Sequence, residues 1–233
     1  DVVVTGVVAG RPSPDAGLRV EADGVVVQGL ELTGFAAGIL LADGARGALI
    51  GSDLDGRTDV EEGNRLTGNR DGLRIEAGAT GHVVRFNVLL ANLRHGISTA
   101  RTAGSANHLS RNLIARNGRA AIGVDRGGAE VPAPVIAAVD PRTGGVRGTG
   151  CAGCIVELFA DGADQASRYL DGGTVAVLPD GTWSVGGLAL TAADGNITAT
   201  ITRVERSGAS TSRLSAPMPR DGSSRWRLVA VPP

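Results

Sequence analysis

The sequence predicts an all-β protein in which a solenoid of short repeated strands is followed by a second, sandwich-like β domain. The 233 residues include 36 glycines and 10 prolines, which interrupt regular helices throughout the chain. Aromatic residues make up only 3% of the chain, so the core must be built from small aliphatic and β-branched side chains, which favour strands. A repeated pattern of glycine, aliphatic and asparagine residues runs through the first half of the chain and then stops.

Glycine–aliphatic pairs define the repeat. They are Gly17-Leu18, Gly38-Ile39, Gly72-Leu73, Gly96-Ile97 and the variant Ala121-Ile122. The last three pairs begin 24 and 25 residues apart. Self-similarity at this interval is typical of a solenoid, in which each unit buries its apolar face only against its neighbours. Strand-length apolar runs at 25–32, 82–90 and 107–115 lie between turn residues.

Six asparagines recur in pairs at nearly the same interval, 23 and then 25 residues apart: Asn64 and Asn69, Asn87 and Asn92, Asn112 and Asn117. An amide side chain that points inward at a tight turn can bond the equivalent amide one coil above and one coil below. We therefore interpret these residues as a structural ladder. The alternative, a set of sugar-binding amides, requires them to face outward.

The repeats resemble those of right-handed parallel β-helix proteins of the pectate-lyase-like superfamily, in particular secreted bacterial β-helix repeat proteins. The match lies in NRLTGNRDGLRI at 64–75, GATGH at 78–82 and the later Asn…Asn…Gly-Ile units, and LIGSDLDG at 49–56 is similar to an insertion common in that family. The resemblance covers roughly residues 1–130 and implies a short right-handed parallel β-helix of about five coils. It implies no particular activity, because the same repeats serve lyases, hydrolases, adhesins and phage spikes.

The pattern changes after Val131-Pro-Ala-Pro134. Alternating strands follow at 155–159, 174–178, 182–185 and 196–202, with Asp-Gly turn dipeptides between them. This pattern predicts a β-sandwich of about 85 residues. The segments 148–159, 180–183 and 212–215 are similar to the Ig-like modules that follow β-helices in bacterial surface proteins. We expect Phe159, Tyr169 and Trp183 to fill its core.

These boundaries divide the chain into a parallel β-helix over residues 1–131, an Ig-like β-sandwich over 132–218 and a C-terminal tail over 219–233. The tail contains one more strand-like run, at 226–231, to which we assign no partner. No apolar run approaches the roughly 18 residues that a membrane span requires.

The two cysteines, Cys151 and Cys154, have the spacing of a redox motif, but a strand pattern follows them where a redox pair would open a helix. We interpret them as a local disulfide that pins a turn, with a small stabilising effect because the closed loop is short. Half of a zinc site is the alternative, although the histidines lie in the other domain. A disulfide favours a secreted or cell-surface location.

Charge is strongly polarised along the chain. All 23 basic residues are arginine against 24 acidic residues, and the absence of lysine excludes lysine-based covalent or P-loop chemistry. Residues 1–76 carry a net charge of −6 from 13 acidic residues and 7 arginines. Residues 77–124 carry +6, with no acidic residue and all three histidines, and residues 125–233 carry −1.

The candidate ligand-binding residues are basic side chains of the middle segment: His82, Arg85, Arg94, Arg101, His108, Arg111 and Arg119. Equivalent residues in a solenoid stack about 5 Å apart, so like charges there repel unless an anion bridges them. The ladder could bind a uronate or sulfated chain through bidentate arginine contacts. The alternative is solvated arginine stems that cover an aliphatic sheet. Nucleic acid is disfavoured by the near-zero net charge and the scarcity of aromatic residues.

A weak calcium site is the one cofactor that the sequence suggests. Asp53, Asp55 and Asp59, with Glu61 and Glu62, form an acidic loop in the longest repeat interval. Their spacing does not fit an EF-hand loop, and a solvated loop is the alternative.

We expect a non-catalytic, extracellular structural or adhesive module. Open solenoid ends expose strand edges, and the oppositely charged halves favour head-to-tail addition into a homo-oligomer or filament. The alternative is binding of an anionic polysaccharide by the Arg/His ladder. Lyase-type cleavage would need this ladder together with Asp71, Glu76 or Asp125 at its borders, because the superfamily's lyases use an arginine or lysine base beside calcium.

Overall fold

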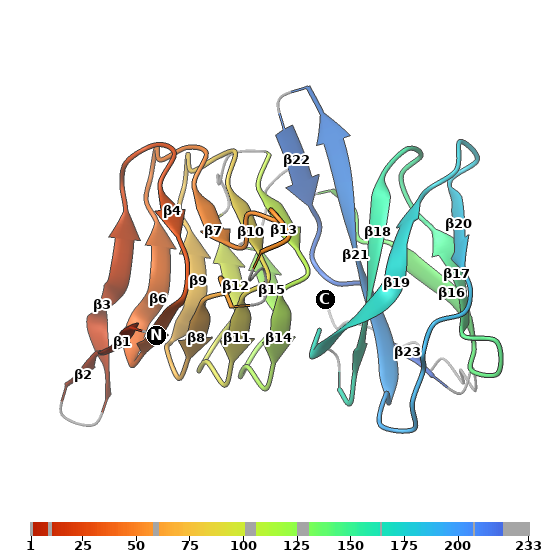
Figure 1. The fold of residues 1–233 in the computed structure, drawn as a ribbon, viewed down its shortest axis with the longest axis horizontal. Coiled ribbons are helices and arrows are strands. Elements are labelled where there is room, and N and C mark those ends of the chain that lie inside the picture. Colours follow the sequence, from red (N-terminus) through yellow and green to blue (C-terminus); the bar gives the residue numbers. More distant parts are fainter. Residues whose placement is uncertain are drawn as a thin grey trace, which may run out of the picture.

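The computed structural model describes residues 2–8, 11–57, 61–100, 106–124, 131–163, 165–206 and 208–220, and within these ranges it contains strands, turns and loops but no helix. Figure 1 shows two parts side by side: a solenoid of stacked strands, β1 to β15, and a pair of sheets, β16 to β23. The prediction of an all-β protein with stacked parallel strands, as in a β-helix, is confirmed.

Three sheets run along the solenoid. Sheet 1 contains β1 (Val2–Thr5), β5 (Leu30–Thr33), β8 (Arg65–Thr67), β11 (Val88–Leu90) and β14 (Leu113–Ala115). Sheet 2 contains β4 (Val26–Val27), β7 (Leu49–Gly51), β10 (Val83–Arg85) and β13 (His108–Ser110). Sheet 3 contains β2 (Val7–Val8), β3 (Arg11–Val20), β6 (Phe35–Leu41), β9 (Asp71–Ile75), β12 (Ile97–Thr99) and β15 (Ile122–Val124). Neighbouring strands are parallel except in the β2–β3 hairpin.

The solenoid core is made of aliphatic columns. In sheet 1, Leu32, Leu66, Leu89 and Ile114 are in register and almost fully buried. In sheet 3, an equivalent column holds Ile39, Leu73, Ile97 and Ile122. Each such side chain contributes roughly 1.5–3 kcal/mol by leaving water. The repeated aliphatic residue is therefore the one that faces the core.

In sheet 3, the glycine that precedes the buried aliphatic residue of each pair is required by close packing. A Cβ on Gly38 would lie 2.7 Å from the carbonyl oxygen of Gly72 and 2.9 Å from the side-chain nitrogen of Asn69. A Cβ on Gly72 would meet Gly96 and Asn92 in the same way. Any larger residue would thus push the next coil away at these positions.

The asparagines face inward and form two ladders along the axis. The side-chain oxygen of Asn87 accepts hydrogen bonds from the backbone (3.0 Å) and side-chain (2.9 Å) nitrogens of Asn64, and Asn112 does the same for Asn87. The second ladder consists of Asn69, Asn92 and Asn117. All six are buried, and each amide nitrogen also donates to a backbone carbonyl.

The second part consists of two antiparallel sheets. The outer sheet contains β16 (Val135–Asp140), β17 (Gly145–Thr149) and β20 (Thr182–Val185). The inner sheet, which lies between the outer sheet and the solenoid in Figure 1, contains β18 (Ile155–Asp161), β19 (Arg168–Ala176), β21 (Asn196–Glu205), β22 (Gly208–Thr211) and β23 (Met218–Pro219). The predicted strand at 226–231 lies outside the described residues.

The aromatic residues of this part do not share one core. Trp183 is buried between the two sheets, as we expected. Phe159 and Tyr169 instead belong to the solenoid's cluster, with ring centres 5.9 Å apart in an edge-to-face contact. The expectation that all three fill the sandwich is wrong, because successive residues of a strand face opposite sides and Phe159 lies on the side toward the solenoid.

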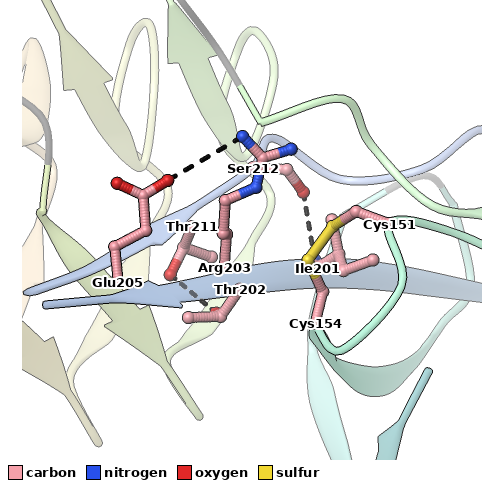
Figure 2. Close-up of a disulfide and its surroundings, with 8 residues drawn as sticks. All are labelled: Cys151, Cys154, Ile201, Thr202, Arg203, Glu205, Thr211 and Ser212. Carbon is pink, nitrogen blue, oxygen red and sulfur yellow. Dashed lines mark hydrogen bonds and ion pairs between the residues drawn. A yellow bond between two sulfur atoms is a disulfide. The ribbon is translucent and has the colours of Figure 1, made fainter. Parts of the chain in front are cut away.

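The disulfide between Cys151 and Cys154 is confirmed, with Cα atoms 5.5 Å apart and a sequence separation of 3. It closes the turn between β17 and β18. Figure 2 shows it beside β21, where Ser212 accepts a hydrogen bond from the backbone of Ile201. Cys154 is buried in the sandwich core, which fits a structural bond.

Residues of the second part cover two of the sheet edges at the C-terminal end of the described solenoid. Ile114 of β14 forms an antiparallel bridge with Ala166 of the second part. β22 lies beside β13, and the backbone nitrogen of Leu109 donates to the Thr211 hydroxyl at 2.9 Å. The inner sheet therefore covers the edges of sheets 1 and 2 at this end.

Candidate functional site

Three arginines stack in successive coils at the corner between sheets 1 and 3. The backbone nitrogen of Arg94 donates to the carbonyl oxygen of Arg70 at 2.7 Å, and Arg119 donates to Arg94 in the same way at 2.7 Å. Each arginine follows the second ladder's asparagine by one or two residues. The second asparagine ladder holds the backbone of this corner, and the backbone in turn sets the position of each arginine. We call Arg70, Arg94 and Arg119 the arginine column.

The column holds two exposed cations and one that is partly neutralised. Arg70 and Arg119 are exposed, whereas the Arg94 side chain is 28% exposed. A guanidinium nitrogen of Arg94 lies 3.4 Å from a carboxylate oxygen of Asp71, and the other oxygen of Asp71 accepts the backbone N–H of His95 at 3.1 Å. Asp71 is only 1% exposed, so this charge is held beneath the column.

The geometry suits a charged chain that runs along the solenoid axis. Successive coils lie about 4.8 Å apart, so the column repeats its positive charge at about the length of one sugar ring. Each guanidinium can donate two parallel hydrogen bonds to a carboxylate or sulfate.

Sequence reasoning missed Arg70, and a signal for it was present. Arg70 precedes Arg94 by 24 residues, and Arg94 precedes Arg119 by 25. Arg70 lies beside Asp71, outside the segment without acidic residues, so the charge pattern does not include it. The period of the repeat identifies the column better than the local charge does.

Four other predicted ligand residues that the structure describes do not share this surface. His82 is fully buried: its ring Nδ1 accepts the backbone N–H of Ala48 at 3.1 Å, and its backbone N–H donates to the side-chain oxygen of Asn107 at 3.1 Å. Burial lowers the pKa of His82, so the ring is held neutral. The interpretation of His82 as a ligand-facing residue is wrong, because its side chain belongs to the interior of the solenoid.

Arg85 and His108 lie on sheet 2. The Arg85 guanidinium donates to the carbonyl oxygens of Ser52 and Asp53 and thereby holds the start of the acidic loop. His108 is half-buried and in register with Val83, and burial, with a smaller contribution from Arg85, lowers its pKa. In the next coil, Asn107 is the residue stacked on His82, and His108 lies one position further along the chain.

Arg111 faces the second part of the fold. Its guanidinium lies 5.6 Å from the ring centre of Phe86 and 5.2 Å from that of Tyr169, and 4.0 Å from a carboxylate oxygen of Glu157. It therefore belongs to the contact between the two parts. Arg101 lies outside the described residues.

The acidic loop contains a group that could hold a metal ion. Carboxylate oxygens of Asp53, Asp55 and Glu62 lie within 4.8 Å of one another. Glu62 also accepts the backbone N–H of Asp53 at 3.1 Å. Asp59 lies outside the described residues.

No protein-family model and no curated protein matches the sequence. Among solved structures, the chain is similar to the enzymatically active domain of tailspike protein 2 from bacteriophage CBA120, with 9% identity and a TM-score of 0.28 over 87% of this chain. It is also similar to the full-length tailspike protein 2 from an Escherichia coli O157:H7 bacteriophage, with 8% identity and a TM-score of 0.26 over 90% of this chain. The chain spans about half of these proteins, 52% and 48% of their lengths. At these values the likeness says nothing about what this chain binds. The described residues contain no helix that is long and apolar enough to cross a membrane.

Proposed function

We propose that the chain is a binding module for an anionic polysaccharide, which it holds along the arginine column. The observation that carries this proposal is the stacking of Arg70, Arg94 and Arg119 in successive coils through backbone hydrogen bonds of 2.7 Å. A column of like charges is unfavourable by itself, and an anionic group on each unit of a linear polymer would relieve it.

The ligand class follows from the donors. Guanidinium groups favour carboxylate and sulfate, whose oxygens accept two parallel hydrogen bonds. A polymer gains from the repeat, because each further unit binds at a raised effective concentration.

The test is retention on immobilised polygalacturonate and on heparin at increasing salt. We expect the double variant R70A/R119A to elute at lower salt than the native chain. R213A is the matched control, since Arg213 is exposed and lies in the second domain. Equal elution of R70A/R119A and R213A would remove the arginine column as the site.

A structural or adhesive module that assembles head to tail is the second candidate function. The opposite net charges of residues 1–76 and 77–124, −6 and +6, favour it. The covered C-terminal end of the solenoid opposes it, so the polysaccharide proposal takes precedence. Negative-stain electron microscopy at micromolar concentration distinguishes them, because filaments support assembly and dispersed particles support binding.

Lyase-type cleavage uses the same ligand and has its own readout. A lyase releases unsaturated uronate, whose conjugated double bond absorbs short-wavelength ultraviolet light. We propose binding without cleavage, because both oxygens of Asp71 are engaged by His95 and Arg94. Release of unsaturated product from polygalacturonate would replace this proposal with the catalytic one.

We also propose the finer division of the chain: a β-helix of about five coils over 1–131, an Ig-like sandwich over 132–218 and a tail over 219–233. The two antiparallel sheets packed around Trp183 support the sandwich. The disulfide supports a secreted or cell-surface location. For the carboxylates of Asp53, Asp55 and Glu62 we propose calcium, because it accepts several oxygen ligands in a flexible geometry.

A further inference from the structure

Gln165 of the second domain ends the second asparagine ladder. Its side-chain oxygen accepts hydrogen bonds from the backbone nitrogen of Asn117 at 3.2 Å and from its side-chain nitrogen at 3.0 Å. Asn117 accepts the same two bonds from Asn92, at 3.0 and 2.9 Å. Gln165 therefore takes the place of the asparagine of a following coil.

The amide nitrogen of Gln165 replaces backbone donors as well. It donates to the carbonyl oxygen of Asn117 at 2.9 Å and to that of Arg119 at 3.3 Å. One coil earlier, the carbonyl oxygens of Asn92 and Arg94 accept the backbone N–H groups of Gly118 and Arg119. One buried glutamine thus makes, at this corner, the hydrogen bonds that the following coil makes elsewhere.

Two of the three sheet edges at this end are also covered. The backbone nitrogen and oxygen of Ile114 pair with those of Ala166 at 2.8 and 2.9 Å. On sheet 2, Thr211 accepts from the backbone of Leu109 and donates its own N–H to Asn107 at 3.1 Å. An uncovered strand edge would be a template for another chain.

A buried carboxylate completes the contact. Glu157 is 6% exposed and accepts the Ser110 hydroxyl at 2.6 Å and the backbone N–H of Arg111 at 3.2 Å. The second domain therefore meets the last coil with side-chain acceptors and donors that match the solenoid's own pattern.

We propose that the second domain is an intramolecular cap in the position of a following coil, and that the solenoid end beneath it is a docking surface for the acidic coils of a second copy. The exposed end would belong to the +6 segment, 77–124, and the entering coils to the −6 segment, 1–76. Head-to-tail stacking keeps the strands of sheet 1 parallel, so this sheet would continue from β14 into β1 of the second copy. The cap competes at a high effective concentration and blocks this addition while it is in place.

The experiment opens the cap stepwise in the full chain: Q165A, then Q165A/A166P, then Q165A/A166P/E157A. Hydrogen exchange of the Ile114 and Asn117 amides reports on the cap, and sedimentation velocity reports on the mass. D180A is the matched control, because Asp180 is an exposed turn residue away from the contact. We expect one variant of this series to be the first that loses amide protection at low protein concentration. As the concentration of this variant rises, its mass should increase and its amide protection should return. High salt should reverse both changes.

A mixing experiment identifies the occupant. Native chain keeps its cap but offers its acidic coils, so fluorescently labelled native chain should co-sediment with the opened variant. Self-association of the variant without binding of native chain would mean that two opened ends pair, and would overturn the proposal. An opened variant that stays monomeric would overturn it too, as would retained protection in the triple variant, because these residues would then not hold the cap.

Discussion

The carboxylate of Asp71, almost fully buried at the start of β9, lies 3.4 Å from the guanidinium of Arg94 in the middle of the arginine column. The same carboxylate accepts the backbone N–H of His95 in the next coil. This single acid therefore supports the stacking of two coils and offsets part of the positive charge that we propose as the ligand site.

We expect Asp71→Asn to strengthen polyanion binding. The amide oxygen still accepts the N–H of His95, while the loss of the negative charge frees Arg94 for the ligand. Calorimetric titration with oligogalacturonate at several salt concentrations should show tighter binding and a steeper salt dependence, by about one additional released ion. An unchanged salt dependence would mean that Arg94 does not contact the ligand.

We expect Asn92→Ala to destabilise the chain by about 3 kcal/mol or more, because it leaves several buried groups without partners. Asn92 accepts from the backbone of Asn69 and donates to Leu66 and Asn117. Urea unfolding measures the loss. Ser98→Ala on the outer face of β12 is the control and should change little. A loss as small as that of the control would show that the ladder adds no stability.

We expect Gly72→Ala to cost about 1–3 kcal/mol through steric overlap. The new methyl group would lie 2.6 Å from the carbonyl oxygen of Gly96 and 2.9 Å from the side-chain nitrogen of Asn92. Alanine occurs naturally at the equivalent position, Ala121, which precedes β15, the last strand of sheet 3 among the described residues. Thermal unfolding of G72A and of A121G compares the two positions. An equal change of melting temperature in both variants would refute the packing argument.

Acid should weaken the solenoid through His82. Burial lowers the pKa of His82 in the folded chain, so the unfolded chain binds the proton more readily. The stabilising effect is complete above the ordinary histidine pKa and is lost as the pH falls toward the lowered one, by at most about 1.4 kcal/mol per pH unit. We expect His82→Asn, which keeps an acceptor for Ala48, to show a smaller loss of unfolding free energy between about pH 7 and pH 5. Parallel pH profiles of the two proteins would rule out this role.

Calcium should raise the melting temperature if Asp53, Asp55 and Glu62 hold it, because an ion that binds only the folded chain stabilises it by mass action. D53N/D55N should abolish the rise. Magnesium is the control ion, since it demands a stricter geometry. An equal rise in the double variant would place the ion elsewhere.

The solenoid was predictable because its information is local and repeated. A glycine that tolerates no Cβ, an aliphatic residue that fills the core and an asparagine that bonds its neighbours recur at one interval, so each coil repeats the evidence for the last. The disulfide was predictable for a similar reason, since Cys151 and Cys154 are only three positions apart.

The candidate site was predictable only in part. The repeat places Arg94 and Arg119 together, and also Arg70, because stacking follows the period. It does not reveal which basic residues face inward. His82 and Arg111 lie in the same basic segment as Arg94 and Arg119. His82 nevertheless fills the interior, and Arg111 packs against Phe86 and Tyr169.

The sequence by itself determined the class of fold and the stacking columns, because each depends on contacts between residues one repeat or one turn apart. Only the tertiary structure decided how the two parts meet. Gln165 and Glu157 carry no local signal, since their partners lie 48 and 47 positions away along the chain, at Asn117 and Ser110. Their role depends on the three-dimensional shape of the last coil, which leaves unpaired donors and acceptors that a distant side chain can match.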